Sequence, residues 1–184
     1  MILYSIVLYL LLVHGVECVR LKEYVQEKAE ICSNSNSDKF VIKLPEPLNY
    51  ASGNSSVRLY GNFTVTDVIQ EPLELIILIN RCTLDMSTCE EFNSLALTNL
   101  CRYINDEKGM AASFFRSIDP VLHCPIKPGI YKFKKSIVDL SFTLPMPMEG
   151  YRWKADLKLY SRIRPKKELL CVASQSMLRW TNKP

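Results

Sequence analysis

The stretch Tyr151–Tyr160, with the sequence YRWKADLKLY, is the part of the chain that decides the fold class. Apolar and polar side chains alternate strictly along most of it. The apolar positions are Tyr151, Trp153, Ala155, Leu157 and Leu159. Because successive side chains of a strand point to opposite faces, this pattern predicts a half-buried β-strand.

The segment before it, Val138–Leu144, alternates in the same way, with apolar residues at the even positions. Pro145, Pro147 and Gly150 separate the two runs. Proline and glycine are typical of turns and sheet edges, so the two runs are predicted to form a hairpin with a long, proline-rich tip.

Three more segments have the character of strands. Val57–Thr66 alternates and carries Asn62 on its polar face, Leu73–Ile79 is apolar on both faces, and Leu169–Trp180 is a plausible last strand. A strand with two apolar faces is expected inside a sheet rather than at its edge.

One segment has helical spacing instead. Its apolar residues fall three or four positions apart, at Phe92, Leu95, Ala96, Leu100 and Ile104. Thr88 and Glu91 are spaced as a capping box, and residues 110–118 are a candidate second helix. The predicted fold is therefore mostly β, an immunoglobulin-like sandwich of two antiparallel sheets with one or two short helices inserted.

The apolar start of the chain indicates the secretory route. Ile2–Val13 is too short to span a bilayer but suits the core of a signal peptide, here placed at residues 1–18. Cleavage there leaves a single domain, residues 19–184, with a net charge of 23 − 18 = +5. This mild charge gives no support for nucleic-acid binding. A basic cluster, Arg162, Arg164, Lys166 and Lys167, fits either a solvated hairpin tip or a patch for anionic head groups.

Loss of Cys18 with the signal leaves an even set of cysteines, which in a secreted chain indicates disulfides. They are Cys32, Cys82, Cys89, Cys101, Cys124 and Cys171. Six cysteines allow 15 pairings, and spacing does not choose among them. Asn54 and Asn62 begin glycosylation sequons.

Catalytic and metal-binding motifs are missing from the sequence. It has no G-x-S-x-G, H-E-x-x-H or C-x-x-C, and His123 is the only histidine after residue 18. We therefore expect no enzyme, no metal and no cofactor.

The segment Cys124–Tyr131, CPIKPGIY, followed by a strand, a proline-containing tip and Gly150-Tyr151-Arg152, resembles the ganglioside-activator-like proteins of the ML lipid-recognition superfamily, whose arthropod-type members share the motif. Leu44–Pro47, Gly53–Ser56 and the Cys82–Cys89 spacing match in the same order. The resemblance covers roughly Cys32 to Leu178. It implies the pairings Cys32–Cys171, Cys82–Cys89 and Cys101–Cys124.

The resemblance also implies a β-cup, in which the sandwich opens at one end onto an apolar cavity for acyl chains. The expected lining residues are Phe63, Val65, Leu75, Ile77, Phe114, Phe115, Phe142, Leu144, Tyr151 and Trp153. Met146, Pro147 and Met148 are expected to form a membrane-touching rim beside the mouth.

The expected function is therefore secreted lipid binding or transfer. The ligand would be a phospholipid or glycolipid, membrane contact would be transient, and a lipid-processing enzyme or receptor would be the partner. The destination would be extracellular or lysosomal. The aromatic residues would equally suit a filled core, so a β-sandwich interaction module without lipid is the alternative.

Overall fold

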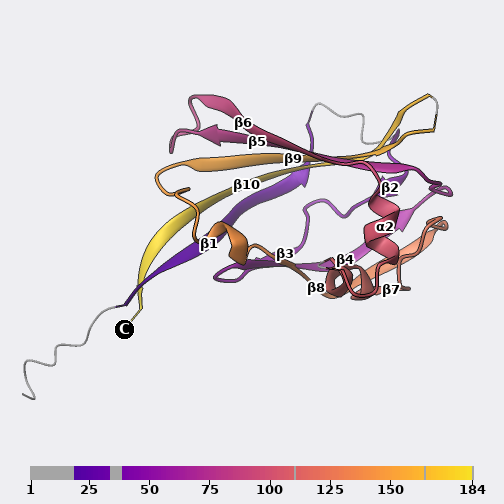
Figure 1. Ribbon diagram of the computed structural model, residues 1–184, viewed down its shortest axis with the longest axis horizontal. Helices are drawn as coiled ribbons and strands as arrows, with labels where there is room; N and C mark the ends of the chain where they lie inside the picture. Colours follow the sequence, from indigo (N-terminus) through magenta and orange to yellow (C-terminus); the bar gives the residue numbers. More distant parts are fainter. Residues whose placement is uncertain (1–18, 34–38, 110, 164, 184) are drawn as a thin grey trace, which may run out of the picture.

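The computed structural model describes residues 19–33, 39–109, 111–163 and 165–183 (Figure 1). The expected signal peptide, residues 1–18, lies outside them, as do Met110 of the candidate second helix and Arg164 of the basic cluster. No helix among the described residues is long and apolar enough to cross a membrane.

Two antiparallel sheets of five strands each make up most of the chain, which confirms the predicted β-sandwich class. The first sheet has the order β1 (Val19–Ile31), β10 (Lys167–Lys183), β9 (Arg152–Ser161), β5 (Leu73–Cys82) and β6 (Cys89–Leu97). The second has the order β2 (Ile42–Lys43), β4 (Ser56–Val65), β8 (Gly129–Asp139) and β7 (Ile118–Asp119), with β3 (Tyr50–Ser52) beside β4. As expected from its two apolar faces, β5 lies inside its sheet, between β9 and β6.

The predicted hairpin of residues 138–160 is wrong. β8 pairs with β4 and β7 in the second sheet, whereas β9 pairs with β10 and β5 in the first. The proline-rich segment between them therefore crosses from one sheet to the other, and its start is the 3-10 turn η2 (Ser141–Thr143) rather than a strand. Alternation identifies a strand but not the strand with which it pairs.

The predicted helix over 92–104 is wrong in its first half. Residues Cys89–Leu97 form β6, and only Leu100–Asn105 form the helix α2. The Cys82–Cys89 disulfide closes the turn between β5 and β6, and the chain then pairs along β5 from Cys82 to Leu75. Tertiary pairing thus overrides the local helical spacing. The candidate second helix is observed as α3, Ala112–Arg116.

β1 was not predicted, although it pairs with β10 over its whole length. The sequence of β1 does not reveal a strand for two reasons. Its Lys, Glu, Gln and Ala residues favour helices, and a bulge between Gln26 and Lys28 interrupts the alternation of its side chains.

Two apolar clusters hold the sheets together. The main core lies between the sheets beside α2 and α3 and includes Phe63, Val65, Leu73 and Leu159. A second cluster centres on Tyr24, Val57 and Leu178, where β1 and β10 curve toward the second sheet (Figure 1). The Tyr24 backbone N–H donates to the Asn54 carbonyl oxygen over 2.8 Å, so this side of the sandwich is closed by backbone contact.

The described part of the chain contains three disulfides, and they confirm the pairing that the resemblance implied. They join Cys32 to Cys171, Cys82 to Cys89 and Cys101 to Cys124. Such bridges indicate that the chain folds in an oxidising compartment.

Candidate functional site

The inner face of the first sheet is only partly covered on its β5–β6 side. Ile77 pairs with Leu157 on β9 and with Leu95 on β6, and directly paired residues share one face of a sheet. Leu75, two residues before Ile77, packs against the main core, which identifies this face as the inner one. Yet Leu75, Ile77 and Leu157 are only half-buried, and Leu95 is 48% exposed.

We call this uncovered surface the open strip and define it as Leu75, Ile77, Ile79, Leu95 and Leu157. It exists because the two sheets differ at this side. The first sheet extends to the nine-residue β6, whereas the second ends in the two-residue β7. Figure 1 shows that the ends of β5 and β6 that are joined by their turn lie away from the second sheet, while β1 and β10 curve toward it.

The open strip ends on a group of aromatic rings. The rings of Phe92 and Trp153 meet edge to face with centroids 4.9 Å apart, and Tyr151 lies 6.4 Å from Trp153. The Trp153 Nε1–H donates to the Met148 carbonyl oxygen over 2.9 Å, which fixes the indole. Arg81 lies over the Tyr151 ring with its Cζ atom 4.7 Å from the centroid.

The residues expected to line a lipid cavity are divided among several places. Phe63 and Val65 are buried in the main core, and Phe114 and Phe115 pack against that core from α3. Packed side chains of this kind fill the sandwich next to Leu75, which contacts the same core from the open strip.

The remaining expected lining residues lie nearer the uncovered side. Leu75 and Ile77 belong to the open strip, and Trp153 and Tyr151 to its aromatic end. Leu144 packs into the second cluster. Phe142 differs most from the expectation, because it is 61% exposed on η2 instead of pointing inward from a strand.

The expected membrane rim is held in place by specific contacts. Lys22 donates from Nζ to the Met146 carbonyl oxygen over 3.0 Å and forms an ion pair with Glu149. Hydrogen bonding from Lys22 lowers the pKa of Glu149, so this ion pair is lost only as the pH falls through that lowered pKa. Met148 packs into the second cluster, which leaves Met146 and Pro147 as the exposed part of the rim.

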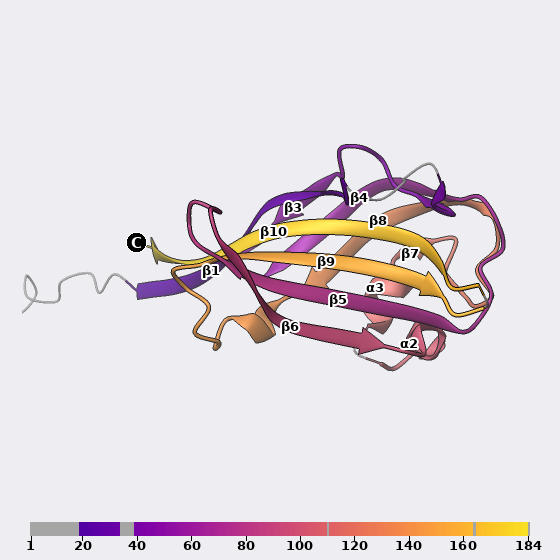
Figure 2. The ribbon, with the colours of Figure 1, turned by 90° about the horizontal axis from the view of Figure 1, so that it is seen from above.

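The basic cluster and this rim do not form one surface. The rim precedes the start of β9, whereas Arg162, Lys166 and Lys167 follow its end, so the ten residues of β9, about 30 Å, separate them. Figure 2 shows β9 running along the length of the sandwich. Lys166 pairs with Glu74 over 2.7 Å and lies 4.4 Å from the Tyr160 ring, as expected for a solvated hairpin tip.

Two surface grooves occur elsewhere. One, of about 380 Å³, lies beside the β9–β10 hairpin and includes Val68, Ile163 and Lys167. The other, of about 370 Å³, lies between β1 and the Glu46–Tyr50 segment. Neither groove is lined by any of the ten residues expected to line a lipid cavity.

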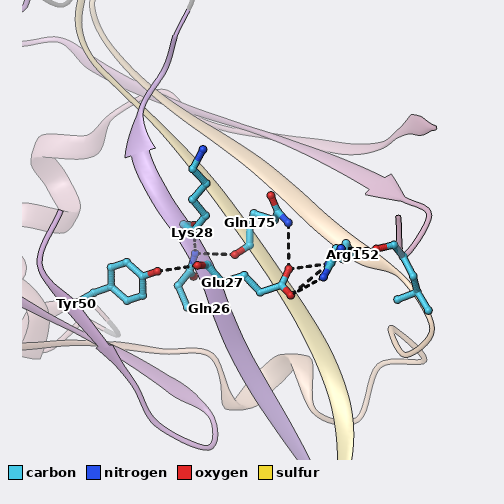
Figure 3. Close-up of polar contacts among 7 residues, drawn as sticks. Gln26, Glu27, Lys28, Tyr50, Arg152 and Gln175 are labelled. Atoms are coloured by element: carbon cyan, nitrogen blue, oxygen red, sulfur yellow. Dashed lines mark hydrogen bonds and ion pairs between the residues drawn. The ribbon is translucent and has the colours of Figure 1, made fainter. Parts of the chain in front are cut away.

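A polar network ties the strands together away from the open strip. Figure 3 shows Glu27 on β1 reaching across β10 to Arg152 on β9. Glu27 accepts from Arg152 Nη2 over 3.1 Å and from Gln175 Nε2 over 3.1 Å. Arg152 also donates to the Leu84 carbonyl oxygen in the β5–β6 turn. The network therefore holds β1, β10, β9 and the β5–β6 turn together beside Trp153, which belongs to the aromatic end of the open strip.

One group of potential metal ligands lies close together, formed by Glu71, Cys101 and Cys124. The two cysteines are joined in a disulfide, so they offer no thiolate to a metal.

The sequence pattern left several site residues unassigned. Strand patterns include Ile79 and Leu157, but helical spacing predicts a helix at Leu95 and Phe92, and no sequence pattern identifies Arg81 as a site residue. No family model matches the chain, and no curated protein matches it.

Proposed function

We propose that this chain is a secreted lipid-binding or lipid-transfer protein that holds acyl chains against the open strip. It performs no chemistry on the lipid, and its selectivity comes from polar groups at the end of the strip. The resemblance to the ML lipid-recognition superfamily supports this proposal, and so does the arrangement of the inner face.

The observation that carries the proposal is the incomplete covering of an apolar inner face. Five aliphatic side chains of the open strip remain half-buried or exposed although they point between two sheets. Each methylene that an acyl chain buries there contributes about 0.8 kcal/mol, which offsets the cost of taking the lipid out of a bilayer.

Transient membrane contact would occur at the end of the molecule that carries the rim. Phe142, Met146 and Trp180 are all exposed there. Lys22 Nζ donates to the Met146 carbonyl oxygen and lies 5.3 Å from the centroid of the Trp180 ring, so the Met146 backbone and the Trp180 ring both lie beside this lysine. Exposed aromatic and methionine side chains beside a lysine suit the interface of an anionic membrane.

Secretion and glycosylation belong to the same proposal. The disulfides indicate an oxidising compartment, and both Asn54 and Asn62 are exposed, as a glycan requires. In this setting the partner would be a phospholipid or glycolipid, together with a lipid-processing enzyme or a receptor that takes it over.

Replacing Phe142 and Met146 with Asp tests the membrane contact. The double variant should extract fluorescent phospholipid from anionic vesicles about tenfold or more slowly, because two apolar contacts become charged. Its thermal stability should stay close to wild type, since both side chains are exposed.

Ile137→Asp is the matched control, because Ile137 is an exposed aliphatic residue on β8. It should leave the rate of extraction unchanged. Equal rates for wild type and the double variant would show that this end does not contact the membrane. Failure of the wild-type protein to extract any class of lipid would contradict the proposed function itself.

An interaction module without lipid is the second candidate, and one observation favours it. β6 is the last strand of its sheet and is exposed along nearly its whole length. An exposed edge with apolar side chains can pair with a strand of another protein. A partner that covers β6 would bury Leu95 and Phe92 in place of an acyl chain.

A further inference from the structure

The open strip ends on a cation. No register shift interrupts the pairing of β5 with β9, so alternation carries the inner face from Ile77 and Ile79 to Arg81, which pairs with Trp153. The six residue steps from Leu75 to Arg81 span about 20 Å, the length scale of an extended acyl chain. An amphiphile lying along the strip would bring its head group to Arg81.

The surroundings of Arg81 hold the guanidinium at this place. Its Nε donates to Glu90 Oε1 over 2.7 Å, Nη2 donates to the same oxygen, and its face rests on Tyr151. The Arg81 side chain is 37% exposed and the Glu90 side chain is 63% exposed, so solvent and ligand can reach both. An exposed ion pair of this kind contributes little to stability and is readily exchanged.

Glu90 shows the chemistry that this site accepts. Its carboxylate occupies the position that an anionic head group would take, on a guanidinium whose face rests on the Tyr151 ring. Planar guanidinium groups bind carboxylates and phosphates through paired, charge-assisted hydrogen bonds.

We propose that Arg81 selects the head group, so that the preferred ligand is an acyl chain ending in a carboxylate or phosphate, which displaces Glu90 from the guanidinium. The inference rests on the proposed lipid-binding function and adds the ligand class to it. Arg81 is then a specificity-determining residue, and Glu90 competes with the ligand within the same chain.

Binding of three amphiphiles with the same chain tests this proposal: lauric acid, lauryl phosphate and lauryl alcohol, measured by calorimetry at neutral pH. Wild type should prefer the two anions over the alcohol. Arg81→Gln should weaken anion binding by about tenfold or more, the usual loss for a hydrogen bond to a charged group, and leave alcohol binding unchanged. Glu90→Gln should strengthen anion binding, because the competing charge is removed.

Arg58→Gln is the control, since Arg58 is an exposed arginine on β4 of the other sheet. It should leave all three affinities unchanged. Comparing the affinities for lauric acid and lauryl phosphate shows whether the natural ligand ends in a carboxylate or in a phosphate, because the matching probe should bind more tightly.

The proposal is overturned if Arg81→Gln keeps the anion preference, or if Glu90→Gln weakens anion binding. Equal affinities of the wild-type protein for acid and alcohol would also overturn it, but would leave lipid binding intact. Binding of none of the three amphiphiles, together with no extraction from vesicles, would instead contradict the proposed function.

Discussion

Replacing Cys32 and Cys171 with Ala should lower the free energy of unfolding by about 5 kcal/mol. The two cysteines are 139 residues apart, and a disulfide restricts the unfolded chain more strongly when it closes a longer loop. For a chain of this size, the loss corresponds to a fall in Tm of roughly 10–20 °C.

The matched control removes Cys82 and Cys89, which are 7 residues apart. The same chain-entropy relation gives about 2.5 kcal/mol for that loop. Cys82 and Cys171 are both almost fully buried, so the cost of truncating each buried sulfur is similar. Urea unfolding of both double variants measures the difference. An equal or larger loss from the shorter loop would contradict the expectation.

Replacing Ile77 with Asp should weaken lipid binding at least about a hundredfold. Ile77 lies in the middle of the open strip, between Leu157 and Leu95. A carboxylate there would have to lose its water against an acyl chain, which costs several kcal/mol. Displacement of a fluorescent fatty acid measures the loss.

Leu78→Asp is the matched control for this substitution. Leu78 is the next residue on β5, is half-buried like Ile77, and points to the opposite face of the sheet. Both variants should lose stability to a similar extent, about 1–3 kcal/mol, whereas only Ile77→Asp should lose lipid. Equal loss of binding in the two variants would mean that the open strip is not the lipid site.

The strands could be predicted from sequence where their alternation is regular. Tyr151–Tyr160 and Val57–Thr66 appear as β9 and β4 because one face of each contributes to the packing between the sheets. Their partners could not be predicted, since alternation is a local property and pairing is not. The chain crosses between the sheets after Asp139, and the alternating pattern does not reveal this crossing.

The site was harder to predict for the same reason. Ile77 was expected to line a cavity because it lies in a predicted strand and the family resemblance implies an apolar β-cup. Leu95 of β6 could not be assigned to the same lining, because its spacing in the sequence also fits a helix.

 Leu95 and Phe92 reach the inner face only because the Cys82–Cys89 bridge turns the chain back along β5. The surroundings of Arg81 come from two other segments of the chain, since Glu90 lies on β6, whereas Tyr151 directly precedes β9 and Trp153 lies on it. These residues meet Arg81 only after the first sheet has formed.

Native mass spectrometry of the protein secreted from a eukaryotic host distinguishes a lipid carrier from a sandwich without lipid. Wild-type protein should carry a copurifying lipid, visible as a mass above that of the glycan-free chain. Ile77→Asp should carry none, and Leu78→Asp should retain it. A bare protein mass for the wild type, with no lipid taken up from vesicles of any class, would contradict lipid binding and favour the interaction module.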